Sequence, residues 1–132
     1  MISRQWRGLA RSEAAQAYEA HLIHETFPAL RKIDGFVDAS ILRRIVETGV
    51  EFLVVTRWSS LEAIAKFSGS DLEAAVVPDK VQRMMVEYDR RVKHYEVVKI
   101  VVTSNRAFES GRAEERRVLA LPLRRRAAQR ER

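Results

Sequence analysis

The sequence predicts an α+β fold of the ferredoxin-like type, β-α-β-β-α-β, with a four-stranded antiparallel sheet. Two stretches rich in β-branched and aromatic residues, 36–46 and 50–58, are separated by a short loop that ends in glycine, which indicates a β-hairpin. Two more strand-like stretches, 2–9 and 90–102, are each separated from this hairpin by a segment with helical character. This order is typical of a split βαβ arrangement, in which both helices cover one face of the sheet.

The first helix is predicted over 13–27, directly after the first strand. Ser12 is a good N-cap, and Glu13 suits the positive end of the helix dipole. Pro28 removes a backbone donor and is expected to end this helix, with at most one further turn after it.

The second helix is predicted to follow the hairpin. Ser59 and Glu62 form a capping box that starts it, and it is expected to end before Gly69. Short helices are then predicted before the last strand, one of them over 71–75, with Pro78 as a break.

Size and composition predict one compact domain and an extension. The chain has 132 residues, of which 46% are hydrophobic and 32% charged, and it has no cysteine, which excludes disulfides and thiolate nucleophiles. Its apolar runs are far shorter than the about 18 residues of a membrane span, and its start contains charges but no apolar leader. We therefore expect a cytoplasmic protein with a domain over 1–104 and an Arg-rich tail over 105–132.

The positive charge is concentrated in the tail. Residues 105–132 contain nine arginines and four glutamates, whereas the rest of the chain is close to neutral. Such a composition predicts a disordered or partly helical segment whose contacts with nucleic acid are nonspecific and salt-sensitive. The third predicted strand lacks the basic and aromatic pattern of an RNA-binding sheet, so we expect no other nucleic-acid contact.

Two tryptophans on neighbouring predicted strands, Trp6 and Trp58, are candidates for a ligand site. Arg4 and Thr56 lie one strand step from them and are expected on the same face, toward the helices. One interpretation is a core with two tryptophans. The other is a cavity in which a flat aromatic ligand stacks on the indoles while Arg4 binds its anionic group. Arg4 could equally pair with an acidic residue inside the fold.

The histidines carry weaker signals. His94 shares a strand face with Glu96, so it could act as a base near neutral pH or form a structural pair. His21 and His24 are spaced to meet one metal ion, but no third ligand can be named, so we expect solvent-exposed histidines and no metal site.

Three short segments, 54–59, 61–67 and 92–97, resemble the antibiotic biosynthesis monooxygenase superfamily, whose members are dimeric α/β-barrel proteins. The resemblance covers about residues 1–100. It implies a homodimer joined through the open sheet faces, which would cover the second apolar face of the stretch 52–55. We expect this interface to contain Leu53, Val55 and Leu9.

The resemblance also bears on the reaction. It implies that heme-degrading members need a first-strand Asn, a Trp that matches Trp58, and a His after the second helix. Trp6 stands at the Asn position and 71–80 contain no histidine, so we expect no heme degradation. Members that oxidise polycyclic phenols to quinones without metal or flavin share the Trp but commonly use the same Asn.

Two hypotheses about function remain. The first is cofactor-independent oxidation of an aromatic or phenolic substrate, with His94 as base and Arg4 holding the anion. Its pocket would be lined by Ile2, Arg4, Trp6, Phe52, Val54, Thr56 and Trp58. The second is a non-catalytic ligand-binding or stress-related dimer, which needs the same pocket for a small aromatic ligand but no base.

Overall fold

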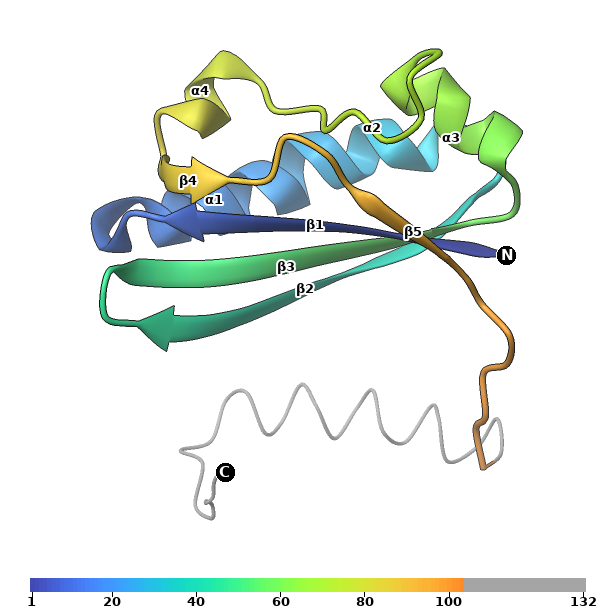
Figure 1. Cartoon of the computed structure of the whole chain (residues 1–132), viewed down its shortest axis with the longest axis horizontal. Coiled ribbons are helices and arrows are strands. Elements are labelled where there is room, and N and C mark those ends of the chain that lie inside the picture. Colours follow the sequence, from blue (N-terminus) through green and yellow to red (C-terminus); the bar gives the residue numbers. More distant parts are fainter. Residues whose placement is uncertain (104–132) are drawn as a thin grey trace. The chain divides into compact units, whose positions relative to one another are not determined.

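The computed structural model describes residues 1–103, and its compact unit comprises Met1–Val97 (Figure 1). One antiparallel sheet has the strand order β2-β3-β1-β4, with β5 also paired to β1. The strands are β1 (Ile2–Ala10), β2 (Phe36–Val46), β3 (Gly49–Trp58), β4 (Met85–Tyr88) and β5 (Lys93–Glu96). The predicted ferredoxin-like fold is thus confirmed, and the predicted tail over 105–132 lies outside the described residues.

One continuous helical segment connects β1 to β2 and packs on one face of the sheet (Figure 1). It consists of a 3-10 turn, η1 (Ser12–Ala14), then α1 (Ala15–His21), a π-helical turn, η2 (Leu22–Thr26), and α2 (Phe27–Arg31). Ser12 is the first residue of η1 and not its N-cap, which is Arg11.

The further turn that the sequence allows after Pro28 is present, because α2 continues the helical segment past the proline to Arg31. In the π turn, the Phe27 N–H donates to the Leu22 carbonyl, five residues earlier. Pro28 thus lies in the first turn of α2, directly after the π turn.

Two short helices, α3 (Leu61–Ser68) and α4 (Asp79–Gln82), lie between β3 and β4. The N-cap of α3 is Ser60, whose Oγ accepts a backbone N–H of the first turn, and not the predicted Ser59. The helix ends before Gly69 as predicted, because Gly69 has a φ of 85°. Residues 71–75 form no helix, and Pro78 precedes α4 instead of breaking a helix.

The last predicted strand, 90–102, is wrong at both ends. The chain enters the sheet earlier, at Met85, and between β4 and β5 it leaves β1 and hydrogen-bonds to the loop that follows α3. Its strand structure ends at Glu96, which pairs with Ile2, the first residue of β1, and the N–H of Val97 donates to the Met1 carbonyl.

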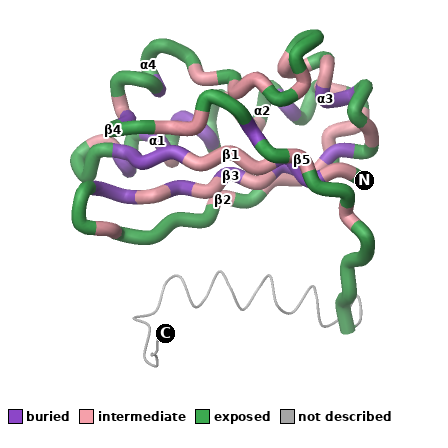
Figure 2. Tube along the Cα trace, viewed as in Figure 1, coloured by how far each residue is buried: buried purple, intermediate pink, exposed green. Residues whose placement is uncertain are grey.

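The hairpin of β2 and β3 is confirmed, and β3 lies between β2 and β1. Phe52 and Val54 point toward the helices and are buried, whereas Leu53 and Val55 lie on the outer face and are half-buried, an alternation visible along β3 in Figure 2. Two apolar clusters fill the helix side, one around Phe52 and one around Trp58 beneath α3.

None of the helices in the described part of the chain has the length and apolar character that crossing a membrane would require.

Candidate functional site

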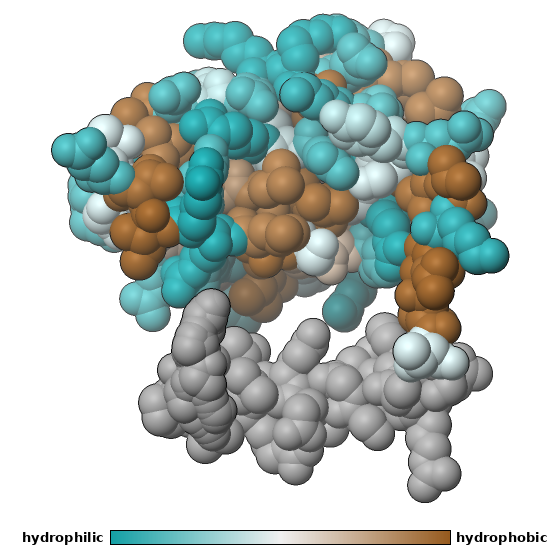
Figure 3. Space-filling model, turned by 60° about the horizontal axis from the view of Figure 1, so that its bottom comes forward, coloured by the Kyte–Doolittle hydropathy of each residue, from teal (hydrophilic) through white to brown (hydrophobic). Residues whose placement is uncertain are grey.

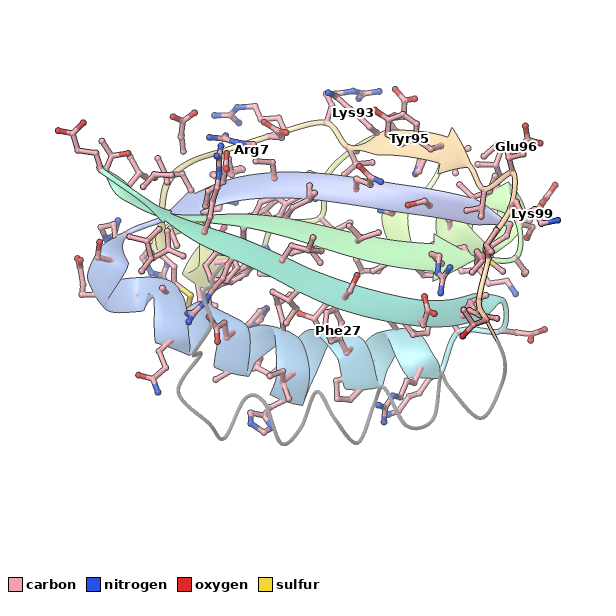
Figure 4. All side chains as sticks on the ribbon, turned by 90° about the horizontal axis from the view of Figure 1, so that it is seen from below. Arg7, Phe27, Lys93, Tyr95, Glu96 and Lys99 are labelled. Atoms are coloured by element: carbon pink, nitrogen blue, oxygen red, sulfur yellow. The ribbon has the colours of Figure 1, made fainter. Side chains whose placement is uncertain are left out.

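A cavity of about 80 Å³ lies between the sheet and the helical segment, and side chains from both core clusters line it. Figure 4 shows Phe27, one of its lining residues, on the sheet side of the helices, and Arg7, Lys93 and Tyr95 on the opposite face of the sheet. The π turn η2 also contributes to the wall, and such turns occur often at functional sites. Most of the wall is apolar, and its polar residues are Arg4, Tyr18, His21, Thr26 and Thr56.

Arg4 is the buried cation of this wall, with 5% of the residue exposed. The strand register places it opposite Thr56 of β3 and His94 of β5. Its guanidinium donates to the carbonyls of Leu72 at 2.6 Å and Ala74 at 2.8 Å, and so ties the loop after α3 to β1. Burial lowers the pKa of Arg4 to about 10, so it stays charged at neutral pH. No carboxylate of the described residues forms an ion pair with it.

His94 is held by Arg4. Its Nε2 lies 2.9 Å from a terminal guanidinium nitrogen, and because a guanidinium can only donate, Nε2 is the acceptor. Burial and, second, the Arg4 charge lower the pKa of His94, while Glu73 opposes them. Glu96, the expected partner, is exposed, and His94 is not among the lining residues of the cavity. The nitrogen through which His94 would act as a base therefore already accepts a hydrogen bond from Arg4.

Acidification should destabilise the protein through His94. Because folding lowers the pKa of His94, the unfolded state takes up the proton first, and the free energy of unfolding should fall as pH drops below the unfolded value of 6.5. His94→Gln keeps an acceptor for Arg4 but does not titrate, so it should lose less stability between about pH 7.5 and about pH 5.5. Urea unfolding at both pH values measures this, and an equal loss in both proteins would contradict it.

Trp6 lies at the cavity wall, two residues from Arg4 on the same strand face. Its indole covers Gly8, where an added Cβ would come within 2.4 Å of the ring, and its Nε1–H donates to the Asp89 carbonyl at 2.8 Å. The ring of Tyr18 packs against it at 6.1 Å between centroids. A neighbouring glycine, a hydrogen bond and an aromatic contact therefore fix the indole in place.

Trp58 and Phe52 are fully buried and do not line the cavity, in contrast to the predicted pocket. Trp58 stacks on Phe67 at 6.2 Å, and its Nε1–H donates to the Thr56 hydroxyl at 2.8 Å. The structure therefore places these two aromatic residues in the core. Of the residues predicted to line the pocket, Ile2 also lies outside the cavity, and the structure brings together Arg4, Trp6, Val54 and Thr56.

His21 is a cavity residue that the sequence interpretation missed. The expectation of solvent-exposed histidines holds for His24, but His21 is 9% exposed and lines the cavity. Its position three residues after Tyr18, on the buried stripe of the helix, is the signal that indicates this placement. Among residues 1–103, no three histidine or acidic side chains are grouped as metal ligands.

The sequence profile of the antibiotic biosynthesis monooxygenase family matches residues 1–79. Solved structures of similar fold include two proposed antibiotic biosynthesis monooxygenases. The Bacillus cereus protein is 19% identical with a TM-score of 0.55, over 79% of this chain and 97% of that chain. The Deinococcus radiodurans protein is 17% identical with a TM-score of 0.54, over 80% and 100%.

A third similar structure is that of the heme-degrader MhuD from Mycobacterium tuberculosis, with two hemes bound in its active site. It is 22% identical with a TM-score of 0.51, over 77% of this chain and 100% of that chain. No curated protein matches the sequence. The structural neighbours share the fold, and the profile covers more than half of the residues. The chain therefore belongs to the antibiotic biosynthesis monooxygenase family.

Proposed function

We propose that this protein binds a small aromatic anion, a phenolate or an aromatic carboxylate, in the cavity beside Arg4. The observation that carries the proposal is the Arg4 guanidinium, which is buried, charged at neutral pH and without a carboxylate partner among the described residues. A buried cation without a counter-charge is energetically costly even when neutral groups accept its hydrogen bonds, and an anionic ligand would offset that cost.

Arg4 also has donors left for a ligand. A guanidinium carries five N–H groups, and the hydrogen bonds to Leu72, Ala74 and His94 use three of them. The Nε–H and one N–H of the second terminal nitrogen remain, which suffices for both oxygens of a carboxylate or for one phenolate oxygen. The apolar and aromatic wall, including Trp6, suits the ring of such a ligand.

The size of the cavity favours a single-ring ligand. A volume of about 80 Å³ has room for several water molecules, so a polycyclic ligand would require wall side chains to move. A porphyrin fits this cavity poorly, and the segment 71–80 that closes it carries no histidine to ligate heme iron. We therefore propose no heme degradation.

For phenolic ligands, we further propose oxidation by molecular oxygen without metal or flavin. One oxygen atom of O₂ enters the ring and the other leaves as water, so that a phenol becomes a quinone. Membership of the monooxygenase family supports this reaction, as does a cavity that would hold an electron-rich anion among apolar walls. Oxygen uptake with phenols separates it from the alternative, a ligand-binding dimer without turnover.

Binding is tested by titrating the protein with para-nitrobenzoate and para-nitrophenol while recording tryptophan fluorescence. Because Trp6 lies at the cavity wall, a ligand beside Arg4 should quench it. Trp6→Phe should bind the ligand, as measured by calorimetry, but lose most of the fluorescence change. No binding of either ligand to the wild type would refute the proposal.

We also propose a homodimer joined through the outer face of the sheet. Leu42 and Leu53 are paired across β2 and β3 on this face, with Val55 beside them, and Leu42 is 49% exposed. Ion pairs of Glu51 and of Arg57 with neighbouring strands flank this apolar strip. Figure 3 shows apolar side chains on this side of the molecule between hydrophilic ones, a distribution typical of an interface core with a polar rim.

Leu53→Asp should therefore yield monomer or aggregate where the wild type sediments as a dimer, because it would bury an unpaired carboxylate in the interface. The control is Ile45→Asp, a change at an 83% exposed residue on the other sheet face, which should leave the dimer intact. Leu9, also predicted for the interface, is 4% exposed within the protomer and contributes little. A wild-type monomer at micromolar concentration in sedimentation velocity would contradict the proposal.

A further inference from the structure

His21 is a buried titratable group at the cavity that the binding of an anion by Arg4 does not use. It is the last residue of α1, directly before the π turn η2. Its side chain is 8% exposed and its ring stacks on Tyr18, with an angle of 18° between the planes. Its Nδ1 is buried and has no hydrogen-bond partner among the described residues. Such an unpartnered group is rare and calls for a functional explanation.

Glu25 stands one helical turn beyond His21, with its Oε1 3.5 Å from His21 Nδ1. Lys80 of α4 donates to both carboxylate oxygens of Glu25, at 2.7 and 2.9 Å. This hydrogen bond is the main cause that holds the pKa of Glu25 below its usual value, so Glu25 is ionised at neutral pH. Because the Glu25 side chain is about half exposed, 53%, a small shift of its carboxylate lets it accept a hydrogen bond from the Nδ1–H of His21.

An N–H at Nδ1 directed to Glu25 selects the tautomer of His21 in which Nε2 carries the lone pair. A carboxylate that accepts from an imidazole N–H also orients the ring, as in other acid–base sites. Lys80 thus holds Glu25 in place, and Glu25 orients His21 so that the nitrogen free to take up a proton is Nε2.

We propose that His21 is the base that takes the proton from a phenolic ligand in the cavity. This inference rests on the proposed function and deepens it to ligands with an ionisable hydroxyl group. The O–H bond of the phenol breaks, its electron pair stays on the oxygen, and an N–H bond forms at Nε2. The imidazolium is then paired with Glu25 and the phenolate with Arg4, so no further reactant is needed.

The other titratable groups near the cavity are less suited to this role. Burial raises the pKa of Tyr18 well above its usual value, so its hydroxyl stays protonated. The Nε2 of His94 already accepts from Arg4, and Thr56 has its hydroxyl engaged by Trp58. His21 is the polar lining residue with both a basic nitrogen and an orienting carboxylate.

The test measures the ionisation state of bound para-nitrophenol from its absorption spectrum, at a pH below the pKa of the free phenol. The wild type should show the phenolate band, and His21→Gln should lose it while the ligand, if bound, remains the neutral phenol. The matched control is His24→Gln, a change at an exposed histidine in the π turn that follows His21, which should keep the band. Glu25→Gln should also reduce the band. Because Glu25 is a surface residue, this variant tests the proposal even if His21→Gln does not fold.

Para-nitrobenzoate distinguishes this inference from the proposed function, because it carries its charge without giving up a proton to the protein. It should bind His21→Gln about as well as wild type. If it binds but para-nitrophenol stays neutral on the wild type, or if His21→Gln and Glu25→Gln both retain the phenolate band, His21 is not the base. If neither ligand binds the wild type, the proposed function itself fails.

Discussion

Replacing Trp58 with alanine should lower the free energy of unfolding by about 3 to 5 kcal/mol, the usual cost of deleting a core aromatic side chain. Trp58 is 0% exposed and stacks on Phe67, so its removal leaves a void between β3 and α3. Domains of this size are stable by only about 5 to 15 kcal/mol, so the change would remove a large share of the total. Urea unfolding followed by circular dichroism measures it.

Trp58→Phe is the matched control. It keeps an aromatic ring against Phe67 and loses only the larger ring and its hydrogen bond to Thr56. Its loss of stability should be clearly smaller, and its affinity for para-nitrobenzoate should stay close to that of the wild type, since Trp58 does not line the cavity. A loss below about 1 kcal/mol for Trp58→Ala would contradict the core role.

Replacing Arg4 with methionine should weaken binding of para-nitrobenzoate by at least about tenfold. A hydrogen bond to a charged group contributes about 1.5 to 3 kcal/mol, and 1.4 kcal/mol corresponds to a factor of ten in the dissociation constant. Methionine fills similar apolar space but cannot donate. The variant should also lose stability, because the carbonyls of Leu72 and Ala74 lose their donors.

Two further variants separate the effects at this residue. Arg7→Met removes an arginine from the same strand, but Arg7 lies on the outer face and pairs with Glu51, so ligand affinity should not change. Arg4→Lys keeps the charge without the planar fork and should bind the ligand with intermediate affinity. Unchanged affinity in Arg4→Met, with the variant folded by circular dichroism, would contradict the assignment.

Strand periodicity predicted much of this site. Because side chains alternate along a strand, Arg4 and Trp6 were expected on one face with Thr56, and the register bears this out. The same pattern puts Trp58 on that face but does not show what lies above it. Helix α3 covers Trp58, and the position of a helix over a sheet depends on tertiary packing.

The errors on the helical side have local physical causes. A proline in a helix interior is normally unfavourable, but here Pro28 lies in the first turn of α2 directly after the π turn, and no simple periodicity marks a π turn. The burial of His21 follows from the stripe that contains Tyr18, whereas its contact with Glu25 depends on side-chain conformation. The end of the last strand could not be predicted from its own residues, because it depends on the register of β5 against β1, in which Glu96 pairs with Ile2.

The most direct test of the central claim is calorimetric titration of the wild-type protein with para-nitrobenzoate and with its uncharged analogue para-nitrobenzamide. The two ligands have nearly the same shape, so they differ mainly in the charge that Arg4 would meet in the cavity. We expect the carboxylate to bind at least about tenfold more tightly, which corresponds to 1.4 kcal/mol. Equal affinity of the two ligands, or no binding of the carboxylate, would contradict an anion site at Arg4.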